Sequence, residues 1–217
     1  MKKIIGIYLA AGNSSRMGTC KLSLPFGKET LGTFALNEIM SSMVDYLLII
    51  TKKQEGISWL RNSRSLQSSS DKWECVVNEH SSEGQSNSLR LGVLRAMQLN
   101  AKSVIVFLAD QPFITLERIN KLILTSKHVE DYVASSIHGV LKPPILFHDT
   151  VFDQLLKISG DQGARSLLKK SIFLGKNVEG EKNELFDIDT LGNYFYAKNN
   201  LLSWYENHHF MKIGDKS

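Results

Sequence analysis

The sequence predicts an α/β protein with a mostly parallel central sheet. Apolar runs of strand length alternate with segments whose apolar residues recur at helical spacing, and this alternation is typical of strands joined by covering helices. The chain of 217 residues is long enough for a substantial core. We expect one domain over 1–205 and a polar C-terminal tail over 206–217.

The elements follow from these patterns in chain order. Apolar runs predict strands over 4–9, 44–51, 73–78, 103–109 and 132–136. Helical spacing predicts helices over 30–42, 55–61, 115–127, 165–170 and 194–205, and the segment 83–92 opens a helix that runs to about residue 99. The Ser-rich segment 62–71 is expected to be a surface loop. The segment 185–190 alternates carboxylates with apolar residues, so we expect a strand with Asp187 and Asp189 on one face.

The bulk composition excludes several classes of protein. The formal net charge is +4 and the basic residues are scattered, which argues against nucleic-acid binding. The sequence shows neither a signal peptide nor an apolar run of the ~18–20 residues that a membrane span needs. Cys20 and Cys75 lack the spacing of a metal or redox motif, so we expect reduced thiols and a cytoplasmic protein.

The stretch 8–25, YLAAGNSSRMGTCKLSLP, follows the first expected strand and carries the clearest functional signal. Small residues let backbone amides approach an anion closely, and the cations Arg16 and Lys21 add full charges. It is not a Walker loop, because Gly18 is followed by Thr-Cys, and it lacks the dinucleotide pattern G-x-G-x-x-G. We interpret it as a nucleoside triphosphate cradle, with an ordinary strand-to-helix turn as the alternative.

Two further segments place polar groups where ligands bind in open α/β sheets. Asp110 lies in the sequence ADQP directly after the most apolar expected strand, where a carboxylate can hold Mg²⁺ beside a triphosphate. The alternative is that Asp110 caps a turn. The segment EGQSNSLRLG, 83–92, opens a helix whose free N–H groups suit a phosphate or a base edge. Plain N-capping is the alternative there.

A third segment, SGDQGAR over 159–165, suits a phosphate on a second substrate. Arg165 at a helix start favours bidentate binding of a phosphate monoester. The alternative is a glycine-rich loop in which Arg165 pairs with a nearby carboxylate. Lys142, in KPPILF, is a weaker candidate for the same anion.

These motifs, in this order over about 4–194, resemble those of the MobA-like nucleotidyltransferases, and most closely the molybdenum cofactor cytidylyltransferases. The family pattern of the cradle is L-A-A-G-x-S-x-R-M-G-x-x-K-L-x-L-P, with Ser23 a departure in its tail. Ala109 replaces a glycine of the family's G-D-Q-P, and LGNY follows Thr190 where the family has P-E-D. The resemblance implies a three-layer, Rossmann-like, glycosyltransferase-A-like (nucleotide-diphospho-sugar transferase-like) fold.

The resemblance also implies an activity: transfer of CMP from CTP to molybdenum-bearing molybdopterin, with release of pyrophosphate. The product would serve hydroxylases of the xanthine dehydrogenase type, one of which would be the recipient partner. The implied cofactor is Mg²⁺, with Mn²⁺ a possible substitute, and the implied catalytic residues are Arg16, Lys21 and Asp110. The resemblance assigns the metal to Asp110 and Asp189, the acceptor to Lys142, Asp161 and Arg165, and the nucleotide to Leu9, Ala10, Ala11, Gly12, Arg16, Lys21, Ser86 and Ser88.

Three other functions stay open. A guanylyltransferase of the same fold would carry L-A-G-G and an Asp before the cradle lysine, where this chain has Ala11 and Cys20. A sugar- or polyol-phosphate nucleotidyltransferase would keep the cradle but is not expected to carry GDQGAR. A nucleotide-binding chaperone that delivers the cofactor without chemistry is the alternative outside enzymes.

Overall fold

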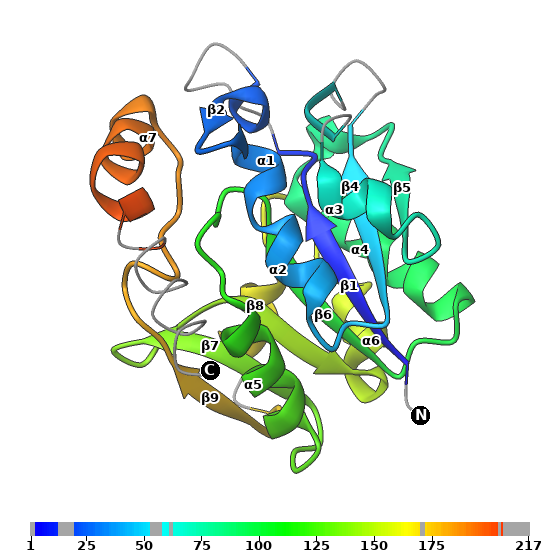
Figure 1. The fold of residues 1–217 in the computed structure, drawn as a ribbon. Helices are drawn as coiled ribbons and strands as arrows, with labels where there is room; N and C mark the ends of the chain where they lie inside the picture. The colour runs from blue at the N-terminus through cyan, green and yellow to red at the C-terminus, as the bar shows by residue number, and fades with distance from the viewer. Residues whose placement is uncertain are drawn as a thin grey trace.

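The structure is a computed structural model that describes residues 3–12, 20–52, 58–60, 63–169, 172–203 and 205. Within these residues seven strands form one sheet, in the order β5-β4-β1-β6-β8-β7-β9 (Figure 1). Their bounds are β1 Ile4–Leu9, β4 Tyr46–Thr51, β5 Trp73–Val77, β6 Ser103–Leu108, β7 Tyr132–Ile137, β8 Val140–His148 and β9 Gly175–Glu179. Of these, β8 runs antiparallel to both neighbours and the other pairs are parallel, so the predicted mostly parallel sheet is confirmed.

Helices cover both faces of the sheet and make three layers (Figure 1). On one face, α2 (Leu36–Ser41) and α5 (Leu116–Ser126) pack on residues such as Tyr8 and Ile105. On the other face, α4 (Gln85–Gln98) and α6 (Phe152–Leu155) pack on Ile7 and Val106. Alternate residues of each strand therefore enter different cores, as the strand period of two requires. This arrangement leaves the ends of the strands open to a ligand.

Two predicted elements have different forms. The helix expected over 30–42 is two short helices, α1 (Leu31–Phe34) and α2, which meet at Ala35. The loop expected over 62–71 contains a helix, α3 (Arg64–Ser68). Leu66 is only 2% exposed, so burial of this one apolar side chain anchors a segment whose composition otherwise resembles a loop. Short 3-10 helices lie at Lys21–Ser23, Ser58–Leu60, Ser81–Glu83, Asp149–Val151 and Ala164–Lys169.

The prediction of a strand over 185–190 is wrong. The segment is extended but pairs with no strand of the described sheet, and the backbone N–H of Ile188 donates instead to the carbonyl of Asp110, at 2.9 Å. The predicted proximity of Asp187 and Asp189 to Asp110 holds nevertheless, because this bond and those that Lys21 and Gln111 donate to Ile188 and Asp187 hold the segment beside the end of β6.

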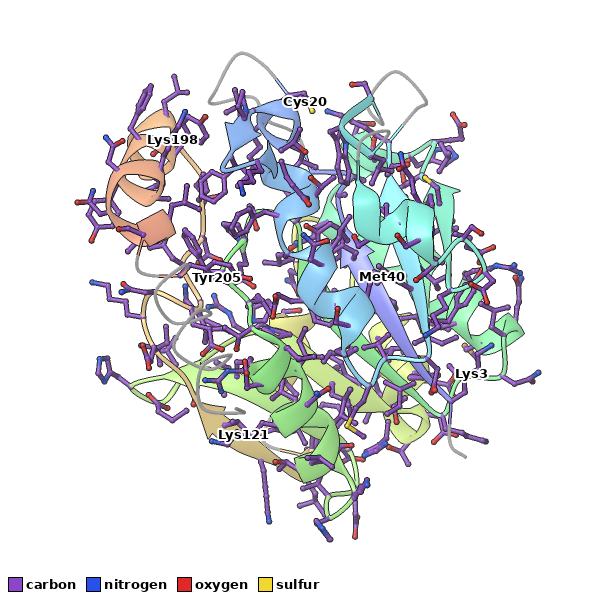
Figure 2. The ribbon with its side chains drawn as sticks, viewed as in Figure 1. Lys3, Cys20, Met40, Lys121, Lys198 and Tyr205 are labelled. Atoms are coloured by element: carbon purple, nitrogen blue, oxygen red, sulfur yellow. The ribbon has the colours of Figure 1, made fainter. Side chains whose placement is uncertain are left out.

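A third, aromatic core ties the C-terminal helix to the segment after the cradle. It lies between the hairpin β2 (Pro25–Phe26) and β3 (Glu29–Thr30), α1, and α7 (Leu191–Tyr196), which continues into a π-helical turn, Ala197–Leu201 (Figure 1). The ring of Phe34 lies 5.0 Å from that of Phe26 and 5.1 Å from that of Tyr205. Tyr205 is labelled in Figure 2. The Tyr194 hydroxyl donates to the Pro25 carbonyl at 2.6 Å. Among the described helices, none is long and apolar enough to cross a membrane.

Candidate active site

Two adjoining cavities of about 430 and 460 Å³ open at the carboxyl ends of β1 and β6. They share part of their lining, including Leu9, Gln85, Asp110 and Asp189. Ligands of open α/β sheets bind at this edge, at the point where the connections of two adjacent strands lead to opposite sides of the sheet. The shared wall means that two small molecules bound here would meet at the carboxylates.

The end of β1 forms one wall of the first cavity. Of the predicted nucleotide-binding residues, those that line it are Leu9, Ala10, Ala11, Gly12, Lys21 and Ser88. The N–H of Ala10 donates to the carbonyl of Ile50 at 2.9 Å, which extends the β1 to β4 pairing to the cavity. Arg16 lies outside the described residues, so its predicted role stays a prediction.

Lys21 joins the cradle to both predicted metal ligands. Its ammonium donates to Asp110 Oδ2 at 2.7 Å and to the Ile188 carbonyl at 3.0 Å, and lies 3.7 Å from Asp189 Oδ1. Lys21 begins the first 3-10 helix, Asp110 follows β6 and Asp189 precedes α7. Three segments distant in the sequence therefore deliver one cation and two carboxylates to one point.

The surroundings of Asp110 fit a divalent cation. Its Oδ1 is buried and has no hydrogen-bond partner among the described residues. Burial raises the pKa of Asp110 above its usual value although Lys21 opposes the shift, and the nearby carboxylates of Asp187 and Asp189 raise it further. A cation on Oδ1 would satisfy this atom.

Within the described part of the chain, no group of three or more His, Cys, Asp or Glu could hold a metal. A cation bound by two carboxylates would therefore need ligands from a substrate, as Mg²⁺ commonly does with phosphates.

The second cavity holds the predicted acceptor residues. Lys142, Asp161 and Arg165 line it, together with Asp187. Lys142 donates to Asp187 Oδ2 at 2.5 Å, so its charge is paired in this state. Arg165 is exposed, and its Nη1 donates to the Leu141 carbonyl at 3.3 Å, which is a long and therefore weak hydrogen bond.

The start of α4 approaches the 160–163 turn so closely that position 84 has no room for a side chain. Gly84 has φ +111°, a conformation that favours glycine, and a Cβ there would lie 2.5 Å from the Gly160 carbonyl oxygen. The backbone N–H of Ser86 donates to the same carbonyl at 3.2 Å. Ser88 lines the first cavity, whereas Ser86 is buried and lines neither cavity. The contact joins the predicted nucleotide and acceptor segments.

Sequence reasoning missed two glutamines at the site. Gln85 lines both cavities from the first position of α4. Gln111 is 1% exposed and donates to Asp187 Oδ1 at 2.8 Å. Each directly adjoins a residue that the motifs did select, Ser86 or Asp110, and this adjacency is the signal that could have found them.

A buried ion pair supports the segment that carries Asp187 and Asp189. Arg118 of α5 binds Glu184 Oε2 through Nε and Nη2, at 3.0 and 2.7 Å, and both side chains are under a tenth exposed. Arg118 Nη1 also donates to the carbonyls of Val178 and Glu179. These bonds fix the chain on its way from β9 to the site.

Comparison with known proteins agrees with the geometry. A family model described as the MobA-like NTP transferase domain matches residues 6–176. Purine catabolism protein PucB of Bacillus subtilis (strain 168) is 34% identical over 194 residues, covering 88% of this chain and 94% of the relative. The crystal structure of Rv0371c from Mycobacterium tuberculosis H37Rv is similar with a TM-score of 0.78 and 25% identity, over 92% of this chain and 99% of that one. A manganese complex of Rv0371c has a TM-score of 0.75 at 23% identity, over 92% and 100% of the two chains.

Proposed function

Since the chain belongs to the MobA-like NTP transferase family, we propose that this nucleotidyltransferase transfers CMP from CTP to the phosphate of molybdenum-bearing molybdopterin and releases pyrophosphate. The observation that carries the proposal is that Asp110 and Asp189 lie at the wall shared by two cavities, with the ammonium of Lys21 beside them in the first cavity. The first cavity would take the nucleotide and the second the phosphorylated acceptor. The curated relative's name, a purine catabolism protein, agrees with a cofactor made for a hydroxylase of the xanthine dehydrogenase type.

The reaction needs alignment and charge neutralisation more than a protein nucleophile. The acceptor phosphate oxygen would attack the α-phosphorus of CTP, the α–β phosphoanhydride bond would break, and pyrophosphate would leave. A divalent cation, Mg²⁺ or Mn²⁺, held by Asp110 and Asp189 would neutralise phosphate charge when bound. Lys21 would exchange its bond to Asp110 for the triphosphate, and Arg16 would add a second positive charge.

The acceptor phosphate would be held by Arg165 and Lys142, with Asp161 beside them. The Lys142–Asp187 pair must loosen for Lys142 to serve, because its charge is already balanced by the carboxylate. Arg165, being exposed and weakly bonded, is the better placed of the two cations.

A calorimetric panel of CTP, GTP, ATP and UTP, with Mg²⁺, with Mn²⁺ and with EDTA, tests the nucleotide assignment. Selective, metal-dependent CTP binding is expected, whereas a preference for GTP would favour a guanylyltransferase. Pyrophosphate release on addition of molybdopterin then separates the enzyme from a delivery chaperone, and release with a sugar or polyol phosphate instead would redirect the acceptor assignment.

Substitutions test the charged cluster directly. Lys21→Ala and Asp110→Ala should each lower turnover by about 10²-fold or more, because each removes a preorganised charge from the transition state. Lys121→Ala, an exposed lysine on α5 (Figure 2), is the control and should leave turnover unchanged. Near-native turnover in either folded site variant would show that its assigned role is wrong.

A further inference from the structure

A buried hydrogen bond between Asn78 and Ser88 lies behind one end of the first cavity. Asn78 follows β5 and is 2% exposed, and Ser88, in α4, is 4% exposed. The Asn78 amide nitrogen lies 2.9 Å from Ser88 Oγ. Ser88 itself lines the cavity, so whatever fixes its hydroxyl also fixes what a ligand meets there.

The direction of this bond is set by a third group. Asn78 Oδ1 lies 2.9 Å from the backbone nitrogen of His80, and a backbone N–H can only donate. The Asn78 atom that faces His80 must therefore be its carbonyl oxygen, and the atom that faces Ser88 must be its NH₂ group. An NH₂ group donates and does not accept, so Ser88 Oγ is the acceptor.

The Ser88 hydroxyl hydrogen then needs another acceptor. A serine within a helix commonly donates to the carbonyl about four residues earlier, here that of Gly84. Neither that bond nor any other from the Ser88 hydroxyl is found among the residues that the structure describes. Because Ser88 lines the cavity, its hydroxyl hydrogen is available to a ligand bound there.

The position of Ser88 assigns this donor to the base rather than to the phosphates. The N–H of Asn78 donates to the carbonyl of Thr51 at 2.7 Å, so the pair lies on the β4–β5 side of β1. Asp110 follows β6, on the opposite side of β1. The cavity is therefore charged at its β6 end and lined by neutral hydroxyls, those of Ser81, Ser82 and Ser88, at the other.

We propose that Asn78 and Ser88 form a base-polarity filter, in which Asn78 holds the Ser88 hydroxyl as a donor to the ring nitrogen of the bound base. Cytosine offers an acceptor, N3, at the middle of its pairing edge, and uracil offers an N–H. Guanine likewise offers an N–H and adenine an acceptor, so the filter favours CTP over both UTP and GTP. Asn78 is thereby a positioning residue that acts through Ser88. The inference rests on the proposed function and names the basis of its nucleotide preference.

The test measures binding of CTP, UTP and 3-deaza-CTP, which has C–H in place of N3, by calorimetry with Mn²⁺. The wild-type protein should bind CTP about tenfold or more tightly than either analogue, the usual effect of one lost or unsatisfied hydrogen bond. Ser88→Ala should abolish the penalty for 3-deaza-CTP. Asn78→Asp keeps the oxygen that accepts from the backbone N–H of His80. It replaces the NH₂ group that faces Ser88 by a second oxygen, which accepts and does not donate. The Ser88 hydroxyl would then donate to residue 78, and the CTP-to-UTP preference should shift toward UTP by about tenfold.

Asn100→Asp is the control for added charge, since Asn100 is exposed and follows the end of α4 at Gln98, which lies about 15 Å from Ser88 at the usual helical rise. Circular dichroism checks folding. If Asn78→Asp does not fold, the affinities of wild type and Ser88→Ala for CTP and 3-deaza-CTP are sufficient to test whether the Ser88 hydroxyl donates to N3. An unchanged 3-deaza-CTP penalty in Ser88→Ala would overturn the filter while leaving the nucleotide site intact. If the wild-type protein binds no nucleotide, the proposed function fails and the filter with it.

Discussion

Replacing Arg118 by methionine should destabilise the whole fold. Arg118→Met keeps much of the aliphatic bulk but removes the guanidinium, which is buried against Glu184. Glu184 would keep one bond, from the Thr115 hydroxyl at 2.7 Å, and its charge would have no counter-ion there. The carbonyls of Val178 and Glu179 would each lose a donor.

The magnitude follows from the burial of this pair. Removing one partner of a buried ion pair costs about 3–5 kcal/mol, because a buried charge is left uncompensated. We expect a loss of about 4 kcal/mol for Arg118→Met, a large share of the roughly 5–15 kcal/mol that holds a domain folded. Nucleotide affinity should fall as well, since Glu184 lies directly before the segment that carries Asp187 and Asp189.

Urea unfolding followed by circular dichroism measures the loss. Lys121→Met is the matched control, because it removes a positive charge from the exposed side of the same helix and should change stability by less than about 0.5 kcal/mol. The double variant Arg118→Met with Glu184→Leu should recover most of the stability, since it leaves no buried charge. A free energy of unfolding within about 1 kcal/mol of wild type for Arg118→Met alone would refute this reasoning.

Three further predictions follow from single contacts. Gly92→Ala should lower the melting temperature, because the new Cβ would lie 2.6 Å from Ile7 Cγ2 and overpacking of about 1–3 kcal/mol outweighs the better helix propensity. Gly84→Ala should weaken CTP binding in calorimetry, because its φ of +111° strains an alanine at the cavity wall. The hydroxyl of Ser136 and the turn amides that follow it lower the pKa of Glu179 from 4.5. Its contribution to stability is therefore present above that pH and is lost as the pH falls through the lowered value, which amide NMR shifts of the turn should report and Glu179→Gln should abolish.

The sequence motifs predicted which residues lie together better than they predicted the bonds between them. Lys21 and Asp110 were both selected from local chemistry, and the rule that ligands bind at the carboxyl ends of parallel strands placed them together. Their direct bond at 2.7 Å is a long-range contact that neither motif encodes. The family and the mostly parallel sheet were likewise predicted from the sequence and are confirmed.

The errors have identifiable physical causes. The alternation around Asp187 matched the pattern of a strand. An extended segment becomes a strand only when another strand offers its backbone groups, whereas the backbone of this segment, among the described residues, bonds to the end of β6 only through the N–H of Ile188 and the carbonyl of Asp110. Around Leu66, serine content suggested a loop, and burial of one side chain decided otherwise. Sequence patterns did not predict two buried polar pairs, Arg118–Glu184 and Asn78–Ser88. Their importance comes from their burial, which the sequence alone does not show.

The aromatic core joins the C-terminal helix to the segment that follows Lys21 in the candidate active site. Tyr194 holds Pro25 and Tyr205 packs on Phe34, while Lys21 lies only a few residues before that hairpin. Segments that share a core open together in native-state hydrogen exchange. Nucleotide bound beside Lys21 should therefore slow amide exchange in α7, even though α7 itself does not line the cavities. We therefore expect the segment 25–34 and α7 to open as one cooperative unit, and a deletion that removes Tyr205 should loosen the proposed nucleotide site.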